Sequence, residues 1–125
     1  MLGPAAPIAF LSTADPARAR EFYEGSLGLA FVADEGFALV FDLAGTMLRV
    51  TRVDTLQPQP FTVLGWRVEG IEPVVGALAA RGVSFERFPG LEQDASGIWS
   101  SPSGARIAWF RDPDGNLLSL TDFGR

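Results

Sequence analysis

The fold is decided by the stretch IAFLSTADPARAREFYEGSLGLAFV, residues 8–32. It opens with an extended segment, residues 8–13, and Asp15 and Pro16 follow shortly after. An Asp at the N-cap accepts a hydrogen bond from the first helical turn, and a Pro at the first helical position needs no N–H donor of its own. These two residues therefore predict that a helix begins here, directly after a strand.

The helix that follows has one apolar face. Ala19, Phe22 and Tyr23 lie at the i, i+3, i+4 spacing of neighbours on a helix surface, so we expect them to be buried. The glycines within residues 25–28 are typical of a helix end. Residues 29–32 are then expected to form a second strand, which completes a β–α–β arrangement.

The same pattern recurs about 55 residues further along the chain. Residues 63–68 predict a strand, a helix is expected to begin around residues 71–73, and residues 83–86 predict the next strand. The helix residues expected to be buried are Val74, Ala77 and Leu78. The chain therefore carries an internal duplication.

Each copy continues with two more expected strands, at residues 36–43 and 46–53 in the first and at residues 105–110 and 116–122 in the second. The repeated unit is therefore βαβββ. We predict one α+β domain, residues 1–125, made of modules at 7–54 and 61–123. The uncharged, proline-containing segment 55–60 is expected to link the two modules.

The last two strands are joined by the clearest turn of the chain, Asp112-Pro113-Asp114-Gly115. Pro sets φ at the second turn position, an Asp side chain bonds back to the backbone, and Gly takes a left-handed conformation. We therefore interpret both carboxylates as turn residues and not as a metal or acid–base pair. Residues 89–104, which include Trp99, remain as a long irregular segment, and such loops in small domains are often functional.

The composition excludes several kinds of chemistry. All 10 basic residues are arginines, and the chain has no His, Lys or Cys. It therefore has no Ser–His–Asp triad, no thiol nucleophile, no Schiff-base lysine and no zinc site of the usual nitrogen and sulfur ligands. The net charge of −5 disfavours nucleic acid as a partner. No apolar run is long enough to span a bilayer and no basic leader is seen, so we expect a cytoplasmic protein without a membrane partner.

Two motifs are similar to those of a known superfamily. The first is DPARAREFY at residues 15–23, followed by Leu-Gly-Leu at 27–29, and the second is WFRDPDGNL at residues 109–117. With the duplicated βαβββ unit, they resemble the vicinal oxygen chelate superfamily, which includes glyoxalases, bleomycin-resistance proteins and extradiol dioxygenases. The resemblance implies an eight-stranded, cup-shaped mixed sheet with the helices outside, and a homodimer.

Metal-dependent members of that superfamily place one His, Glu or Gln ligand on the first and last strand of each module, pointing into the cup. By motif spacing, the four corresponding residues here are Ile8, Arg49, Val63 and Ser119. Two of them are aliphatic, one is cationic and one is a neutral hydroxyl. We therefore expect no metal cofactor, and we do not expect glyoxalase or dioxygenase activity by the superfamily's metal mechanism.

Strand alternation indicates which side chains line the cup. If Ala44 and Gly45 form a tight hairpin, one face carries Val40, Asp42, Met47 and Arg49, and the other carries Phe37, Leu39, Phe41, Leu48 and Val50. The second face is expected to be the helix-covered core. The same alternation places Ile8, Phe10, Val63, Arg67 and Ser119 in the cup.

Two candidate residues have alternative interpretations. Arg49 either forms an ion pair with Asp42, diagonal to it on the same face, or, with or without Arg67, clamps a carboxylate, phosphate or enolate oxygen of a ligand. Trp99 either packs in the hairpin or core, or stacks over a planar ligand at the mouth of the cup.

These observations lead to one main functional hypothesis and two alternatives. The main one is a metal-free protein that binds a small organic molecule in the cup and thereby sequesters a drug or a metabolite. The first alternative is a metal-independent lyase or isomerase of a carbonyl or carboxylate substrate, with Arg49 as electrophile and Asp42 as base. The second is a metal-dependent enzyme of the superfamily. Without an identified catalytic residue, the sequence leans towards a binding protein.

Overall fold

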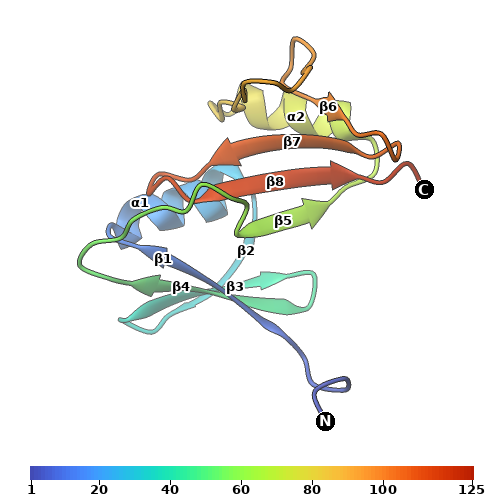
Figure 1. Cartoon of the computed structure of the whole chain (residues 1–125). Coiled ribbons are helices and arrows are strands. Elements are labelled where there is room, and N and C mark those ends of the chain that lie inside the picture. Colours follow the sequence, from blue (N-terminus) through green and yellow to red (C-terminus); the bar gives the residue numbers. More distant parts are fainter. The chain divides into compact units, whose positions relative to one another are not determined.

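The computed structural model describes all residues from 1 to 125 (Figure 1). Its internal contacts divide the chain into two units, Met1–Gln57 and Pro58–Arg125. The boundary lies within the proline-containing segment 55–60. None of the helices is both long and apolar enough to cross a membrane.

The first unit is a four-stranded sheet with one helix. In chain order it contains β1 (Ile8–Thr13), α1 (Pro16–Arg20) with its π-helical continuation η1 (Glu21–Ser26), β2 (Ala30–Asp34), β3 (Ala38–Leu43) and β4 (Thr46–Arg52). The strand order is β1-β4-β3-β2. β1 pairs with β4 in parallel, and the two other pairings are antiparallel.

The second unit repeats this topology. It contains β5 (Leu64–Arg67), α2 (Ile71–Ala80), β6 (Trp99–Ser100), β7 (Arg106–Arg111) and β8 (Leu117–Asp122). The strand order is β5-β8-β7-β6, and β5 pairs with β8 in parallel. The predicted α+β class and the twofold βαβββ unit are therefore confirmed, with the eight strands arranged as two four-stranded sheets.

The short strand β6 corrects the sequence prediction. Residues 83–86 do not form the expected strand, and only Phe85 makes an isolated antiparallel bridge, to Phe110 of β7. β6 instead arises within the segment expected to be irregular, where Trp99 pairs with Ile107. Phe85 and Trp99 thus lie along the same edge of β7. The register in this region is set by tertiary contacts, which a strand pattern in residues 83–86 alone does not reveal.

The core of the first unit lies between its helix and one face of its sheet. Tyr23, Phe41 and Leu48 are fully buried, and the ring centroids of Tyr23 and Phe41 are 5.9 Å apart. Asp15 caps α1 as predicted, accepting a hydrogen bond from the Arg18 amide at 3.2 Å. The placement of Phe37 in the core is wrong, because this residue precedes β3 and its side chain is exposed.

The core of the second unit lies between α2 and one face of its sheet, as Figure 1 shows. Ile71 and Val75 of α2 are buried, whereas Ala77 is exposed and Val74 and Leu78 are half-buried. The buried face of α2 is therefore rotated by about one residue relative to the predicted face. The helix begins at Ile71, directly after Gly70, and its buried apolar face includes Ile71 itself.

Two buried or half-buried polar side chains organise the ends of these elements. The Asp112 carboxylate accepts hydrogen bonds from the amides of Asp114 and Asn116, at 3.0 and 2.9 Å, which supports the interpretation of this motif as a turn. Asp122 at the end of β8 accepts from the amides of Gly70 and Ile71, at 3.0 and 3.2 Å, and thereby caps α2.

Candidate functional site

Each sheet has one face that carries its helix and a second face, here called the open face. In the first sheet, Phe10 lies directly opposite Arg49, and Arg49 lies opposite Val40. Ile8 and Asp42 both lie opposite Met47, in the next row of the same face. The register thus brings the four predicted residues of this unit, Ile8, Phe10, Asp42 and Arg49, onto one open face.

The predicted hairpin explains this register. Ala44 and Gly45 have φ values of 51° and 97°, so both turn residues are left-handed and the strands β3 and β4 pair up to Leu43 and Thr46. The Asp42 side chain is used by this turn, since its carboxylate accepts a hydrogen bond from the Gly45 amide at 3.0 Å.

The ion pair between Arg49 and Asp42, one of the two alternatives for Arg49, does not form. A guanidinium nitrogen of Arg49, Nη2, lies 2.7 Å from a carboxylate oxygen of Glu35, in the loop between β2 and β3. The Phe37 ring from the same loop lies over the guanidinium, 5.5 Å from centroid to Cζ. The Arg49 side chain is only 18% exposed, whereas that of Glu35 is 45% exposed. The loop between β2 and β3, which the sequence did not single out, therefore holds Arg49.

The second sheet also collects its four predicted residues on one open face. A row across the sheet joins Trp99 to Ile107, Ile107 to Thr121 and Thr121 to Arg67. Ser119, two residues before Thr121, lies opposite Gly65, and Val63 continues this side of β5. Figure 1 shows the strands that carry this row, β5 to β8.

Arg67 and Trp99 are both held by neighbours within the second unit. Arg67 donates a hydrogen bond to the backbone carbonyl of Arg125 at 3.0 Å, and its guanidinium lies 5.3 Å from the Phe123 ring centroid. The Trp99 ring packs beside Trp109 at 6.1 Å between centroids, and Trp109 in turn contacts Phe88 edge-on. These contacts agree with hairpin packing for Trp99.

The residues at the four metal-ligand positions do not fit a metal ion. In the first unit the positions hold an aliphatic side chain, Ile8, and a guanidinium, Arg49, that is already paired with a carboxylate. In the second unit they hold Val63 and the neutral hydroxyl of Ser119. Divalent cations in such sites are bound by imidazole, thiolate or carboxylate groups, and none of the four side chains supplies one.

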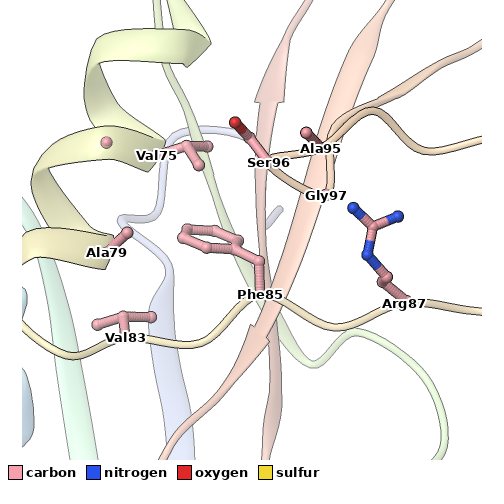
Figure 2. Close-up of a pocket in the computed structure, with 9 residues that line it drawn as sticks. Val75, Ala79, Val83, Phe85, Arg87, Ala95, Ser96 and Gly97 are labelled. Atoms are coloured by element: carbon pink, nitrogen blue, oxygen red, sulfur yellow. The ribbon is translucent and has the colours of Figure 1, made fainter.

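Two pockets lie away from the open faces, and neither is lined by any of the eight predicted residues. One, of about 500 Å³, lies beside the start of α1 and the end of β4 in the first unit. The other, of about 340 Å³, lies between α2 and residues 83–97 in the second unit (Figure 2). Arg87 is the only charged residue that lines the second pocket. No sequence pattern predicted this pocket, because one of its walls comes from α2 and the others come from the irregular segment that follows the helix.

The chain is similar to a family of known proteins along nearly its whole length. The model of the Glyoxalase/Bleomycin resistance protein/Dioxygenase superfamily matches residues 5–120. The uncharacterized protein YraH of Bacillus subtilis (strain 168) is 29% identical over 115 residues, which cover 80% of this chain and 84% of YraH.

Solved structures agree in fold. A member of the same superfamily from Sphaerobacter thermophilus DSM 20745 superposes with a TM-score of 0.76 at 23% identity, over 98% of this chain and 99% of that one. The genomically encoded fosfomycin resistance protein FosX from Listeria monocytogenes has a TM-score of 0.72 at 16% identity, over 94% and 92% of the two chains. At these identities the likeness concerns the fold.

Proposed function

This chain belongs to the Glyoxalase/Bleomycin resistance protein/Dioxygenase superfamily, and we propose that it binds a small organic acid on the open face of its first sheet without a metal ion. By such binding the protein would sequester a drug or a metabolite, as the main hypothesis from the sequence expects. The ligand class follows from the surroundings of Arg49.

The pairing of Arg49 with Glu35 carries the proposal. A guanidinium presents paired N–H donors that match the two oxygens of a carboxylate. Glu35 pairs with Arg49 through one such contact, from Nη2 to a carboxylate oxygen at 2.7 Å. Because Glu35 is 45% exposed, its ion pair contributes only about 0–1 kcal/mol. A ligand carboxylate is therefore able to replace that of Glu35 at low cost.

Aromatic side chains flank the same guanidinium. Phe10 lies opposite Arg49 in the β1–β4 register, and Phe37 lies over the guanidinium from the neighbouring loop. Both phenylalanines are 62% exposed, so their rings are available to a ligand. A planar apolar group next to a carboxylate would remove both rings from water, which is favourable by the hydrophobic effect.

Two observations favour binding over catalysis. The side chains at the four metal-ligand positions do not fit a metal ion, so they do not support the superfamily's metal-dependent chemistry. The base expected for a metal-independent lyase or isomerase is Asp42, but its carboxylate accepts a hydrogen bond from the Gly45 amide in the hairpin turn, and the carboxylate beside Arg49 is that of Glu35, which is ion-paired with it. The homodimer stays a prediction, which analytical ultracentrifugation of the full chain would test.

The proposal is tested by titrating the ¹⁵N-labelled full chain with naphthoate and with the neutral naphthamide, following amide chemical shifts by NMR. We expect naphthoate to shift the amides of Phe10, Phe37 and Arg49. Arg49→Gln is expected to weaken binding about tenfold or more, as loss of a charge-assisted contact does. Glu35→Gln is expected to strengthen it up to about fivefold, because the internal competitor is removed.

Arg52→Gln is the matched control, since Arg52 is an exposed arginine of the same strand, β4, and lies outside the row of Phe10 and Arg49. It should leave the affinity unchanged. Equal binding of naphthoate and naphthamide, or naphthoate binding that survives Arg49→Gln, would overturn the proposal. So would the absence of any shift at the three amides.

A further inference from the structure

The second unit has a pocket of about 340 Å³ beside α2, which plays no part in the proposed function. It lies on the helix-carrying side of the second sheet, because its Phe85 ring packs edge-on against Phe110, whose side chain belongs to the buried core under α2. Its volume lies in the lower part of the range of small-molecule sites. The pocket is thus separate from the open face of either sheet.

Small residues create this space. Gly76 and Ala79 of α2 line it, as do Ala95 and Gly97 of the loop. Figure 2 shows Ala79 on the helix side and Gly97 on the loop side, with the apolar side chain of Phe85 between them. At Gly97, where φ is 93°, a Cβ atom would lie 3.1 Å from the Cβ of Phe85. The loop therefore approaches Phe85 closely at Gly97, where a residue with a Cβ atom would crowd it.

The loop wall is held in place by the Gln93 side chain. Its amide nitrogen donates to the carbonyls of Glu86 and Gly97, both at 2.8 Å, and its carbonyl oxygen accepts from the Phe88 amide at 2.8 Å. Three hydrogen bonds of one side chain thus join residues 86–88 to Gly97. The wall is therefore preformed, and a ligand would not have to order it.

Arg87 supplies the charge at the rim. Its guanidinium donates to the backbone carbonyls of Gln93 and Asp94. A guanidinium has five N–H donors, so donors remain for a ligand. The nearby carboxylates are already bonded: Glu86 pairs with Arg111 at 3.0 Å, and Asp94 accepts from the amides of Ser96 and Ile98. No acidic side chain lines the pocket.

We propose that this pocket is a binding site for a single-ring aromatic carboxylate. The ring would lie on Phe85 and Val83, in the space left by Gly76 and Ala79, and the carboxylate would pair with Arg87. The inference does not rest on the proposed function, since the site lies within the second unit and shares no residue with the surroundings of Arg49.

The test uses NMR titration of the ¹⁵N-labelled full chain carrying Arg49→Gln, which removes the guanidinium of the first site. Benzoate is the probe and benzamide its neutral counterpart. We expect benzoate to shift amides within residues 75–79, 83–87 and 95–97, and to bind about fivefold more tightly than benzamide because of the added charge pairing. Arg87→Gln is expected to remove this preference.

A pair of helix variants separates a specific site from surface adsorption. Ala79→Phe fills the pocket and should abolish the benzoate shifts. Ala80→Phe is the matched control, because Ala80 is an exposed neighbour on α2 that does not line the pocket, and it should leave the shifts intact. Circular dichroism would establish that both variants are folded.

Equal affinity for benzoate and benzamide would overturn the ligand class. Shifts that persist in Ala79→Phe, or that never occur at these amides, would overturn the site. A benzoate response in this pocket, together with no naphthoate response at the amides around Arg49 in the unsubstituted chain, would refute only the proposed function, and the reverse pattern would refute only the present inference.

Discussion

Gly65 of β5 lies directly opposite Ser119 of β8, and the Ser119 hydroxyl is 2.7 Å from the point that a Cβ atom on Gly65 would occupy. The hydroxyl therefore fills the space that a side chain would take. This explains why the strand carries a glycine at a position where glycine weakens β structure. Ser119 itself is buried, so the contact belongs to the packed part of the sheet.

Gly65→Ala should lower the free energy of unfolding by about 1–2 kcal/mol, because the new methyl group meets the Ser119 hydroxyl closer than packed atoms allow. Ser119→Ala removes that hydroxyl. In the double variant the cost of Gly65→Ala should therefore fall, and a double-mutant cycle by urea denaturation would measure the coupling. Additive effects of the two substitutions would refute the contact.

Ala44 is the only residue other than glycine with a positive φ, 51°. The left-handed conformation costs a residue with a Cβ atom about 1–2 kcal/mol, and asparagine tolerates it better. Ala44→Asn should therefore raise the free energy of unfolding by about 0.5–1 kcal/mol. Ala44→Val, which is β-branched, should lower it. Urea denaturation of both variants checks the sign, and equal signs would contradict the turn geometry.

Asp122 links stability to pH. The amide of Gly124, followed by those of Ile71 and Gly70, holds the pKa of the Asp122 carboxyl below its usual value. An Asp with a lowered pKa stabilises the folded state above its unfolded pKa, about 3.9, and this contribution is lost as pH falls through the folded pKa. The stability difference between wild type and Asp122→Asn should therefore be largest near neutral pH and shrink below about pH 4.

Urea denaturation between about pH 2 and 7 measures that difference. Asp54→Asn is the control, since Asp54 is exposed and caps no helix. Its difference from wild type should stay small across the whole range. A difference for Asp122→Asn that does not change with pH would show that the cap does not depend on the charge.

Gln93 should be the most sensitive polar residue of the second unit's loop. Gln93→Ala removes three hydrogen bonds of 2.8 Å and leaves their backbone partners without the amide. With about 0.5–1.5 kcal/mol for each bond, we expect the free energy of unfolding to fall by about 2–3 kcal/mol. Gln57→Ala, at an exposed position, should change it little. A small effect at both positions would mean that the loop is held by other contacts.

Metal ions should have no stabilising effect. A ligand that binds the folded state raises the unfolding midpoint with its concentration. Since Ile8, Arg49, Val63 and Ser119 offer no ligand set, the midpoint should be the same with added Zn²⁺, Mn²⁺ or Ni²⁺ as with a chelator. A concentration-dependent rise in calorimetry would instead require a site made of other residues.

The positions of the candidate residues could be predicted to a useful extent, and their partners could not. The turn at Ala44 and Gly45 sets the β3–β4 register, and period-two alternation then places Asp42 and Arg49 on one face, as observed. The partner of Arg49 is Glu35, which lies 14 residues earlier, in the loop between β2 and β3. Alternation applies only within strands, so it could not place Glu35 and it wrongly placed Phe37 in the core, because both residues precede β3.

The sequence by itself determined the duplicated βαβββ units, the helix cap at Asp15, the turn at Asp112 and the absence of usable metal ligands at four positions. All of these depend on residue type and on short-range spacing, which are local properties. Only the tertiary structure decided that Arg49 pairs with Glu35, that β6 forms at Trp99 and that a pocket opens beside Arg87. Each of those results from loops that meet across the fold, where the choice among competing partners depends on distances that no local pattern encodes.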